Sequence, residues 1–469
     1  MGGDEPKEPE EPHGPSTGDE TTTPPQPDDE LPSQHQHEPD ALDLVDVEVP
    51  GLPGPTVWAR ARAHVIDLTP LRRSRQFRLL WIGQSVSEVG SRITMVALPF
   101  QMFELTHSTL AVGLIGLCEL IPLLTLSVVG GAVADSVDRR KLLLLAHVGM
   151  IGVTALLAVN AATGANYVWV LYLAATLQAS GYALYSPAMR SLVPRFVAPD
   201  LLPAAMALTG AYGSFGSLIG PVIGGVLIAA LGVKTAYYID MATFAWALAT
   251  LALMAPVPPH AEAGRVSWES IKEGLRFLKG RPVLQSTFTF DLNAMIFGMP
   301  TALFPAVAKS LGGGAGVLGL LYAAPEAGAF VVNLLSGRAK HVRRQGLAVQ
   351  VSIVAWGLAI VVFGFSNWLW LCMVGLAIAG GADMWSAIFR STILQTVTPE
   401  NMRGRLSGIE LAVVASGPAL GDLEAGVVAA LTSVQTSIVA GGTLCVVGVC
   451  VLSLLSPQFA KYDARDPTP

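Results

Sequence analysis

Twelve long runs of apolar residues dominate this sequence, and they limit the folds open to it more than any other feature. A helix that crosses a lipid bilayer needs about 20 mainly apolar residues. Runs of about this length lie at 78–103, 109–134, 142–163, 167–188, 203–231, 235–255, 283–307, 315–336, 347–366, 368–389, 406–431 and 435–456. We therefore expect an all-α integral membrane protein with twelve transmembrane helices.

The composition agrees with this expectation. Hydrophobic residues make up 52% of the chain and charged residues 14%, whereas a soluble domain carries about 25% charge. Such a chain lacks the polar surface that a globule in water needs, which excludes an ordinary soluble enzyme. Its few cysteines all lie in or beside apolar runs without metal-ligand spacing, so we expect core cysteines, no metal site and no cofactor. They are Cys118, Cys372, Cys445 and Cys450.

The distribution of basic residues predicts the orientation of the helices. If the twelve runs cross in alternation, 25 of the 29 Lys and Arg residues fall on one side, and only Lys234 and Lys309 fall on the other. Basic residues accumulate on the cytoplasmic side of membrane proteins. We therefore expect a multi-pass protein of the plasma or inner membrane with both termini in the cytoplasm.

The chain divides into six segments. Residues 1–50 hold 15 Asp and Glu but only one basic residue, Lys7, and such an acidic, proline-rich segment is predicted to be disordered. Trp268, Ile271 and Leu275 recur at helical spacing between basic residues, which predicts an amphipathic helix in the central loop. The predicted segments are an acidic tail (1–56), a basic juxtamembrane segment (57–77), a first six-helix bundle (78–255), a cytoplasmic linker (256–282), a second six-helix bundle (283–456) and a C-terminal tail (457–469).

The two sets of six runs resemble each other in sequence at an offset of 200 residues. RSLVPRFVAPDLL at 190–202 and RSTILQTVTPENM at 390–402 share Arg-Ser, Val, Pro and an acidic residue at matching positions. Both stretches connect an even-numbered run to the next odd-numbered run. An internal repeat of this kind is typical of transporters, and it predicts two bundles related by pseudo-two-fold symmetry around a central cavity.

The loop after the second run, GGAVADSVDRRK, contains Gly131, Asp135, Asp138, Arg139 and Arg140 in the pattern G-x-x-x-D-x-x-[GD]-R-[RK]. The glycine permits close helix approach, and Asp135 at the helix end can pair with an arginine across the bundle. We interpret these residues as a conformational latch, a charge network that holds one conformation and breaks in the other. The alternative is a basic turn that only sets the topology.

The fifth run contains Gly216, Gly220, Pro221, Gly224 and Gly225, which form the pattern G-x-x-x-G-P-x-x-G-G. Small residues four apart form a flat face for tight packing between membrane helices, and the proline kinks the helix. The alternative is the general glycine packing that is common in membrane helices.

Ionisable residues inside a membrane are costly and are candidates for function. Glu119, Asp291 and Glu326 are our candidates for proton or substrate coupling. Glu88 and Arg92, further candidates for transport or proton coupling, are four residues apart and share a helix face, so they form a structural pair or have a gating or substrate role. The charged residues that we single out within the runs are Glu88, Arg92, Glu119, Asp240, Asp291, Glu326, Asp383, Glu410, Asp422 and Glu424.

Three of these acidic residues, Asp383, Asp422 and Glu424, are expected to meet arginines such as Arg390 and Arg403 near the cytoplasmic side. Aromatic residues could also line the cavity between the bundles, although packing or lipid contact is the more common role of any one of them. The aromatic candidates are Phe100, Phe103, Tyr182, Tyr185 and Phe288.

Residues 70–456 resemble the major facilitator superfamily. The loop after the second run is similar to its signature between helices 2 and 3, and the fifth run to its antiporter motif. DLNAMIFGMPTALFPAVA (291–308), GLLYAAPEAGAFVVNLLSG (319–337) and LQTVTPENMRGRLSG (394–408) resemble the enterobactin-exporter branch in its actinobacterial form. The fourth run lacks the arginine of many proton-coupled antiporters, with Arg92 as a candidate substitute.

The resemblance implies a secondary active efflux transporter that exports a siderophore or a similar amphipathic small molecule by alternating access and proton antiport. A broad multidrug pump of the macrolide or tetracycline type is the first alternative, and a transport-fold receptor or lipid flippase is the second. No HExxH, GxSxG or P-loop pattern is present, so we expect neither an enzyme nor an ATP-driven pump. The expected partners are a small-molecule substrate, the proton and the lipid bilayer, with no nucleic acid, and the chain is expected to be a monomer.

Overall fold

The computed structural model describes residues 67–257 and 268–465, apart from the side chains of residues 127–136, 268–271 and 401. The predicted acidic tail, residues 57–66 of the basic juxtamembrane segment, and the surroundings of Gly131 and Asp135 lie outside the described residues. The described part is helical throughout its regular structure and has no β-strand.

Twelve long helices fill the described part of the chain, in the two sets of six that the apolar runs predict. The first six are α3 (Arg75–Thr106), α4 (Thr109–Ser136), α5 (Arg139–Ala162), α6 (Val168–Phe196), α7 (Leu202–Leu231) and α8 (Val233–Ala252). The second six are α10 (Pro282–Gly298), α12 (Ala315–Leu335), α13 (Gln345–Phe365), α14 (Leu369–Val397), α15 (Glu400–Leu431) and α16 (Val434–Leu455). The shorter elements are α2 (Thr69–Arg73), η2 (Pro199–Leu201), α9 (Trp268–Leu278), η3 (Thr301–Leu303), α11 (Phe304–Ser310), η4 (Ser336–His341) and α17 (Pro457–Lys461).

Nine of the spans among the described residues are long and apolar enough to cross a bilayer by length and composition. The other three long helices, α3, α6 and α8, are more polar. α3 carries Glu88 and Arg92, α8 carries Asp240, and α6 carries Gln178. These helices pack among the apolar ones: α3 packs on α7, α6 on α4 and α8 on α5.

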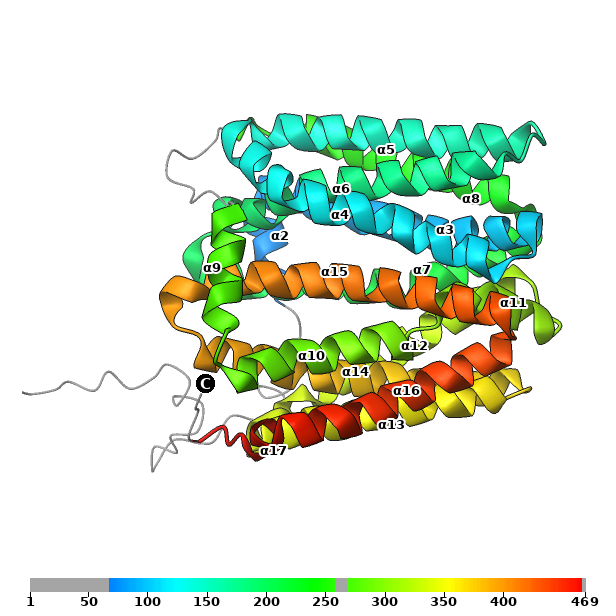
Figure 1. Cartoon of the computed structure of the whole chain (residues 1–469). Helices are drawn as coiled ribbons and strands as arrows, with labels where there is room; N and C mark the ends of the chain where they lie inside the picture. Colours follow the sequence, from blue (N-terminus) through cyan, green and yellow to red (C-terminus); the bar gives the residue numbers. More distant parts are fainter. Residues whose placement is uncertain (1–66, 258–267, 466–469) are drawn as a thin grey trace, which may run out of the picture. The chain divides into compact units, whose positions relative to one another are not determined.

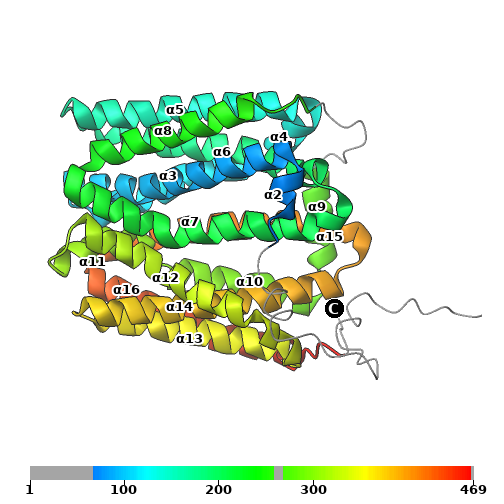
Figure 2. The ribbon, with the colours of Figure 1, turned by 180° about the vertical axis from the view of Figure 1, so that it is seen from behind.

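The long helices form two bundles that lie against each other (Figure 1). In the first bundle α4 packs on α6, and α8 packs on both α3 and α5; in the second, α13 packs on α14 and α16. The bundles meet along a seam in which α7 packs on α12 and α4 packs on α15. Figure 2 shows α7 between α3 and α12. The expected all-α fold with two six-helix bundles is confirmed.

The seam is tighter at one end than at the other. We name the two ends by the short helices that lie there in Figure 1, the α9 end and the α11 end. Near the α11 end, a Cβ added to Gly225 of α7 would lie 3.0 Å from the Cα of Gly319 of α12. Near the α9 end, a Cβ added to Gly213 of α7 or to Gly404 of α15 would meet no atom within 4 Å. The bundles are therefore in backbone contact at the α11 end and not at these positions of the α9 end.

The seventh span is broken. The sequence predicts one continuous run at 283–307, but α10 ends at Gly298, and the chain continues as η3 and α11. The physical reason is Pro300, which lacks an N–H and disfavours helical geometry at Met299. Trp356 of α13 donates its indole N–H to the free carbonyl of Gly298 at 2.9 Å, which stabilises the helix end inside the bundle.

Candidate functional site

A cavity of about 410 Å³ lies inside the first bundle. It brings together three of the predicted residues, Glu88, Arg92 and Glu119, from α3 and α4. It also contains Asp240 and several aromatic side chains from α6 and α8. The cavity is lined by Glu88, Ser91, Arg92, Thr94, Met95, Glu119, Leu123, Met150, Gln178, Ala179, Tyr182, Tyr185, Asp240 and Phe244.

Glu88 and Arg92 form the ion pair that their spacing predicts. The Nε and Nη2 atoms of Arg92 both lie 2.8 Å from Oε1 of Glu88. Two glycines of α7 lie directly against this pair: a Cβ on Gly216 would lie 2.6 Å from Cγ of Glu88, and Gly220 contacts the side chain of Arg92. The glycines of the fifth span therefore make room for a charged pair, which the sequence pattern did not reveal.

Asp240 is fully buried in the wall of the cavity. One of its carboxylate oxygens accepts a hydrogen bond from Oγ1 of Thr94 on α3 at 2.5 Å, and the other lies 3.4 Å from Oγ1 of Thr243. The structure joins α8 to α3 through this carboxylate.

An aromatic cluster lies beside these charged residues. The rings of Tyr182 and Tyr185 are 5.5 Å apart. His147 of α5 lies between Tyr185 and Phe244, at 5.9 and 6.0 Å, and its Nδ1 is 2.8 Å from the carbonyl oxygen of Leu143. Sequence reasoning missed His147, because a lone histidine in an apolar run carries no motif.

The second bundle holds a buried charge cluster. Arg390 of α14 forms an ion pair with Asp291 of α10, and both side chains are less than one-tenth exposed. Asp383 lies 3.8 Å from the same guanidinium. The sequence counted Arg390 among the cytoplasmic basic residues, and the structure corrects this: it lies inside the bundle, whereas Arg190 at the repeat-related position is exposed. The expected pairing of Asp383 with Arg390 is confirmed.

Glu326 of α12 connects the two charge clusters across the seam. It interacts electrostatically with Arg92 of the first bundle and with Asp383 of the second. The acidic and basic residues therefore form a series from Glu88 and Arg92, through Glu326, to Asp383, Arg390 and Asp291. Helices of both bundles contribute residues to this series of charges.

Asp422 of α15 pairs with no arginine among the described residues, contrary to the expectation. Its Oδ1 accepts hydrogen bonds from the hydroxyl of Thr301 at 2.5 Å and from the backbone N–H of Ala302 at 2.7 Å. The reason is the break in the seventh span, which frees backbone N–H groups that need an acceptor. Glu119 of α4 interacts electrostatically with this carboxylate across the seam.

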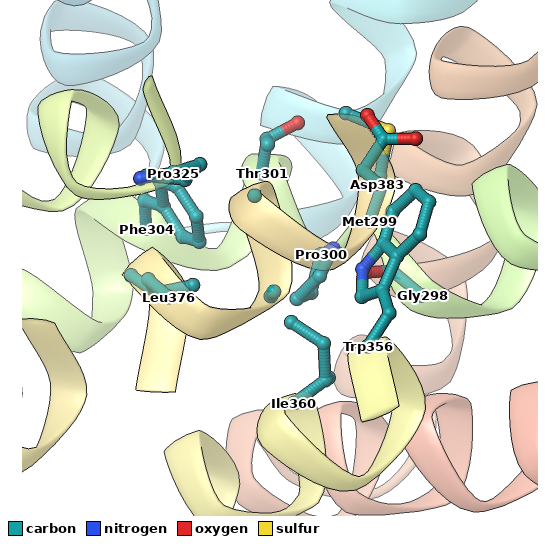
Figure 3. A pocket seen from close by; sticks show the side chains of 12 residues that line it. Gly298, Met299, Pro300, Thr301, Phe304, Pro325, Trp356, Ile360, Leu376 and Asp383 are labelled. Atoms are coloured by element: carbon teal, nitrogen blue, oxygen red, sulfur yellow. The ribbon is translucent and has the colours of Figure 1, made fainter. Parts of the chain in front are cut away.

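A small apolar pocket of about 60 Å³ surrounds the same break. Figure 3 shows its lining residues around the bend at Pro300, with Phe304 after the bend and Trp356 and Asp383 from neighbouring helices. The pocket is about the size of a few water molecules, so it is room for the bend to move and not a site for a large ligand.

The loop motif ties α5 to α8. Asp138 accepts hydrogen bonds from the N–H groups of Arg140 at 2.8 Å and Lys141 at 3.3 Å, and so caps α5. Arg140 donates to the last carbonyl groups of α8, those of Leu251 at 3.1 Å and Ala252 at 2.5 Å. These contacts stay within the first bundle, and Arg139 is buried beside them.

The sequence profile of the transmembrane secretion effector family matches residues 66–469. The chain belongs to this family of the major facilitator superfamily. Its curated relatives include the enterobactin exporter EntS of Citrobacter koseri, 32% identical over 414 residues that cover 87% of this chain and 98% of the relative. The EntS of Salmonella typhi is 32% identical over 406 residues, which cover 84% and 95% of the two chains.

Solved structures of major facilitator proteins have the same fold. A bacterial homologue of the lysosomal transporter Spinster, in an inward-facing and unoccupied conformation, superposes with a TM-score of 0.65 at 15% identity over 82% of this chain and 97% of that one. The nucleoside transporter NupG superposes with a TM-score of 0.65 at 14% identity over 82% and 98%. At these identities the likeness concerns the fold alone.

These comparisons establish the class of the molecule. Its relatives are membrane transporters and not enzymes, so this chain is a multi-pass membrane transporter of the secretion effector family with a small molecule as its substrate. Within residues 67–257 and 268–465, no group of three or more His, Cys, Asp or Glu side chains has the geometry of a metal site.

Proposed function

We propose that this transporter exports a siderophore or a similar amphipathic small molecule across the inner membrane, in exchange for protons. The observation that carries the proposal is the 32% identity to enterobactin exporters over nearly their whole length. At that level of identity the fold and the arrangement of helices are shared, which supports a shared substrate class.

The chemistry of the cavity supports an amphipathic substrate. One wall carries the aromatic rings of Tyr182, Tyr185 and Phe244, which suit flat apolar groups. The Glu88–Arg92 pair lies beside these rings in the same cavity, and its guanidinium can bind a carboxylate or a phenolate. A pocket with an apolar body and a few polar groups is typical of small-molecule sites.

The uneven seam supports alternating access. The bundles are in backbone contact at the α11 end, whereas an added Cβ on Gly213 of α7 or Gly404 of α15 near the α9 end meets no atom within 4 Å. If both termini lie in the cytoplasm, as the basic residues predict, this state opens toward the cytoplasm. Rocking of the two bundles about the seam would then open the α11 end, and the loop motif of Gly131, Asp135, Asp138, Arg139 and Arg140 would act as the latch between the states.

Glu119, Asp291 and Glu326 remain our candidates for proton coupling. Arg92 lies between Glu88 on its own helix and Glu326 on the other bundle. A proton on Glu326 would remove the attraction across the seam and leave Arg92 with Glu88 alone. This exchange of partners would couple protonation to the separation of the bundles. We propose that the protein works in this way as a monomer.

The test uses inside-out membrane vesicles from cells with and without the chain. The vesicles are supplied with iron-free enterobactin and with a respiratory substrate that acidifies their interior. We expect accumulation only in vesicles with the chain, its loss on addition of a protonophore, and strongly reduced coupling in Glu326→Gln. Lys234→Ala, an exposed charge far from the cavity, is the matched control. Equal accumulation in all vesicles would reject the proposal.

The same vesicles separate the alternatives. Accumulation of macrolides or tetracyclines as strong as that of enterobactin would favour a multidrug pump. Transfer of a labelled phospholipid between leaflets without siderophore flux would favour a flippase, and specific binding without any flux would favour a receptor.

A further inference from the structure

The break in the seventh span creates a new helix start inside the protein. The first N–H groups of a helix have no partner within it and need an acceptor from elsewhere. Here the acceptor comes from another helix, because Oδ1 of Asp422 on α15 binds both the hydroxyl of Thr301 and the N–H of Ala302. Asp422 therefore caps η3 and α11 from outside, in the position where a charged carboxylate is most favourable.

The same residue lies at the seam between the bundles. A Cβ on Gly113 of α4 would lie 2.5 Å from the carbonyl oxygen of Asp422, and one on Gly116 would lie 3.4 Å from its Cβ. One turn further along, Oγ1 of Thr109 donates to the carbonyl oxygen of Gly426 at 3.3 Å. This stretch of α15 thus touches η3 on one side and the first bundle on the other.

The helix that Asp422 caps carries a contact across the α11 end. Lys309 near the end of α11 reaches the first bundle, where its Nζ lies 3.7 Å from Oε1 of Glu104 and 3.4 Å from Nδ1 of His107. The ammonium also lies 5.7 Å from the centre of the Phe103 ring. We call the contact of Lys309 with Phe103 and Glu104 of α3 and with His107, the C-cap residue of α3, the α11 seal.

Few titratable side chains face Asp422 among the described residues. Glu119 faces it from α4 and Tyr322 from α12, and Glu424 lies on its own helix. The hydroxyl of Tyr322 is 3.4 Å from the carbonyl oxygen of Thr301. Glu119 also lines the cavity of the first bundle, so its carboxylate connects that cavity to Asp422 electrostatically.

We propose that Asp422 is the residue that controls the α11 seal. As a carboxylate it caps η3 and holds α11 so that Lys309 stays on Glu104 and His107. As a neutral acid it binds the helix start more weakly, and α11 moves away from α3. The proposal rests on the alternating access proposed above. It names Asp422 as the residue that releases the α11 seal.

The expected size of the effect follows from the cap. Loss of a helix N-cap changes an equilibrium between capped and uncapped forms by about two- to thirtyfold. A neutral side chain of the same shape keeps part of the cap, so the change should fall within this range and should not abolish folding. Because the effect acts on a conformational equilibrium, it is visible without any substrate.

The experiment measures the distance between nitroxide labels at Lys234→Cys on α8 and Ser310→Cys on α11. The full chain is used in lipid nanodiscs, with Cys118 and Cys450 replaced by serine; Cys372 and Cys445 are buried. Pulsed electron paramagnetic resonance gives the populations of short and long distances at neutral and mildly acidic pH. No substrate is present.

We expect the long-distance population of the native chain to rise about two- to thirtyfold on acidification. Asp422→Asn should show the long distance already at neutral pH and should lose the response to acid. Thr301→Ala, which removes one donor and keeps the carboxylate, should raise the long-distance population at neutral pH and keep a response to acid. Glu424→Gln, a change two residues away on the same helix, should behave as the native chain.

An acid response in Asp422→Asn equal to that of the native chain would overturn the inference. If that variant does not fold, unchanged distances in Thr301→Ala at neutral pH would also overturn it. The assay is independent of the proposed substrate. If the distances respond to acid but the chain transports no siderophore, only the proposed substrate is rejected. If the chain exports a siderophore but the distances do not respond to acid, only the proposed role of Asp422 is rejected.

Discussion

Gly225 of α7 and Gly319 of α12 hold the two bundles in backbone contact at the α11 end, where a Cβ on Gly225 would lie 3.0 Å from the Cα of Gly319. Two other glycines of the fifth-span motif contact a different helix, since Gly216 and Gly220 lie against Glu88 and Arg92 of α3. The motif thus serves two contacts at once. One joins the bundles, and the other makes room for the charged pair of the cavity.

The first prediction concerns the contact between the bundles. Gly225→Leu places a large side chain where only backbone fits, so the α11 end should not close and export should fall to background. Because the added volume can be relieved by separation of the bundles, the melting temperature should fall by only a few degrees, as for a loss of about 1 kcal/mol. Vesicle transport and thermal unfolding in detergent are the measurements.

Gly149→Leu is the control for this prediction, because nothing lies within 4 Å of a Cβ at that position of α5. It should transport at the native rate. Native transport by Gly225→Leu would show that the backbone contact at the α11 end is not needed in the cycle.

The second prediction concerns Arg92. Arg92→Ala removes the partner of Glu88 and the positive charge opposite Glu326, so transport should be lost while the fold survives. The pair is about one-third exposed, and such pairs contribute about 1 kcal/mol or less to stability. We expect a small change in melting temperature and a large change in flux. Arg92→Lys keeps the charge and should retain part of the flux. Full transport activity of Arg92→Ala would show that Arg92 is not needed for transport.

The third prediction concerns the buried pair of the second bundle. Arg390→Ala leaves Asp291 charged and without its partner, which costs about 3–5 kcal/mol. The double variant Asp291→Ala with Arg390→Ala should be more stable than Arg390→Ala alone, because the unpaired charge of Asp291 is gone and only Asp383 has lost its arginine. Denaturant or thermal unfolding of the four proteins forms a double-mutant cycle. Additive losses would contradict a direct pairing between these two residues.

The fourth prediction concerns the loop motif. Arg140→Ala removes the donor to the carbonyl groups of Leu251 and Ala252, so the end of α8 should fray and its amide protons should exchange faster. The loss of stability should be about 1 kcal/mol, as for other helix caps. Lys141→Ala, in which an exposed neighbouring charge is removed, is the matched control. Equal exchange in both variants would leave Arg140 without a capping role.

The local chemistry of the chain predicts most of the fold. An apolar run of about 20 residues can satisfy its backbone in lipid only as a helix, so the number and order of the spans follow from hydropathy. The break in the seventh span is a partial exception. Pro300 is visible in the sequence, but several other spans contain proline and remain continuous, among them α7 with Pro221 and α12 with Pro325.

The candidate site was only partly predictable. The Glu88–Arg92 pair follows from helical spacing, because both residues lie on one helix and the distance between them is local. The pairing of Asp291 with Arg390 joins α10 to α14, and that of Asp422 with Thr301 joins α15 to η3. Such pairs depend on which helices become neighbours and on their rotation, and no local pattern encodes either.

The sequence alone determined that this chain spans a membrane as two related sets of six helices, because hydrophobic length is a property of each segment by itself. Only the tertiary structure decided which charges meet, that Arg390 lies inside the second bundle, and that the bundles touch at the α11 end. Contacts between helices arise from packing in three dimensions, where residues 99 or 121 positions apart become partners.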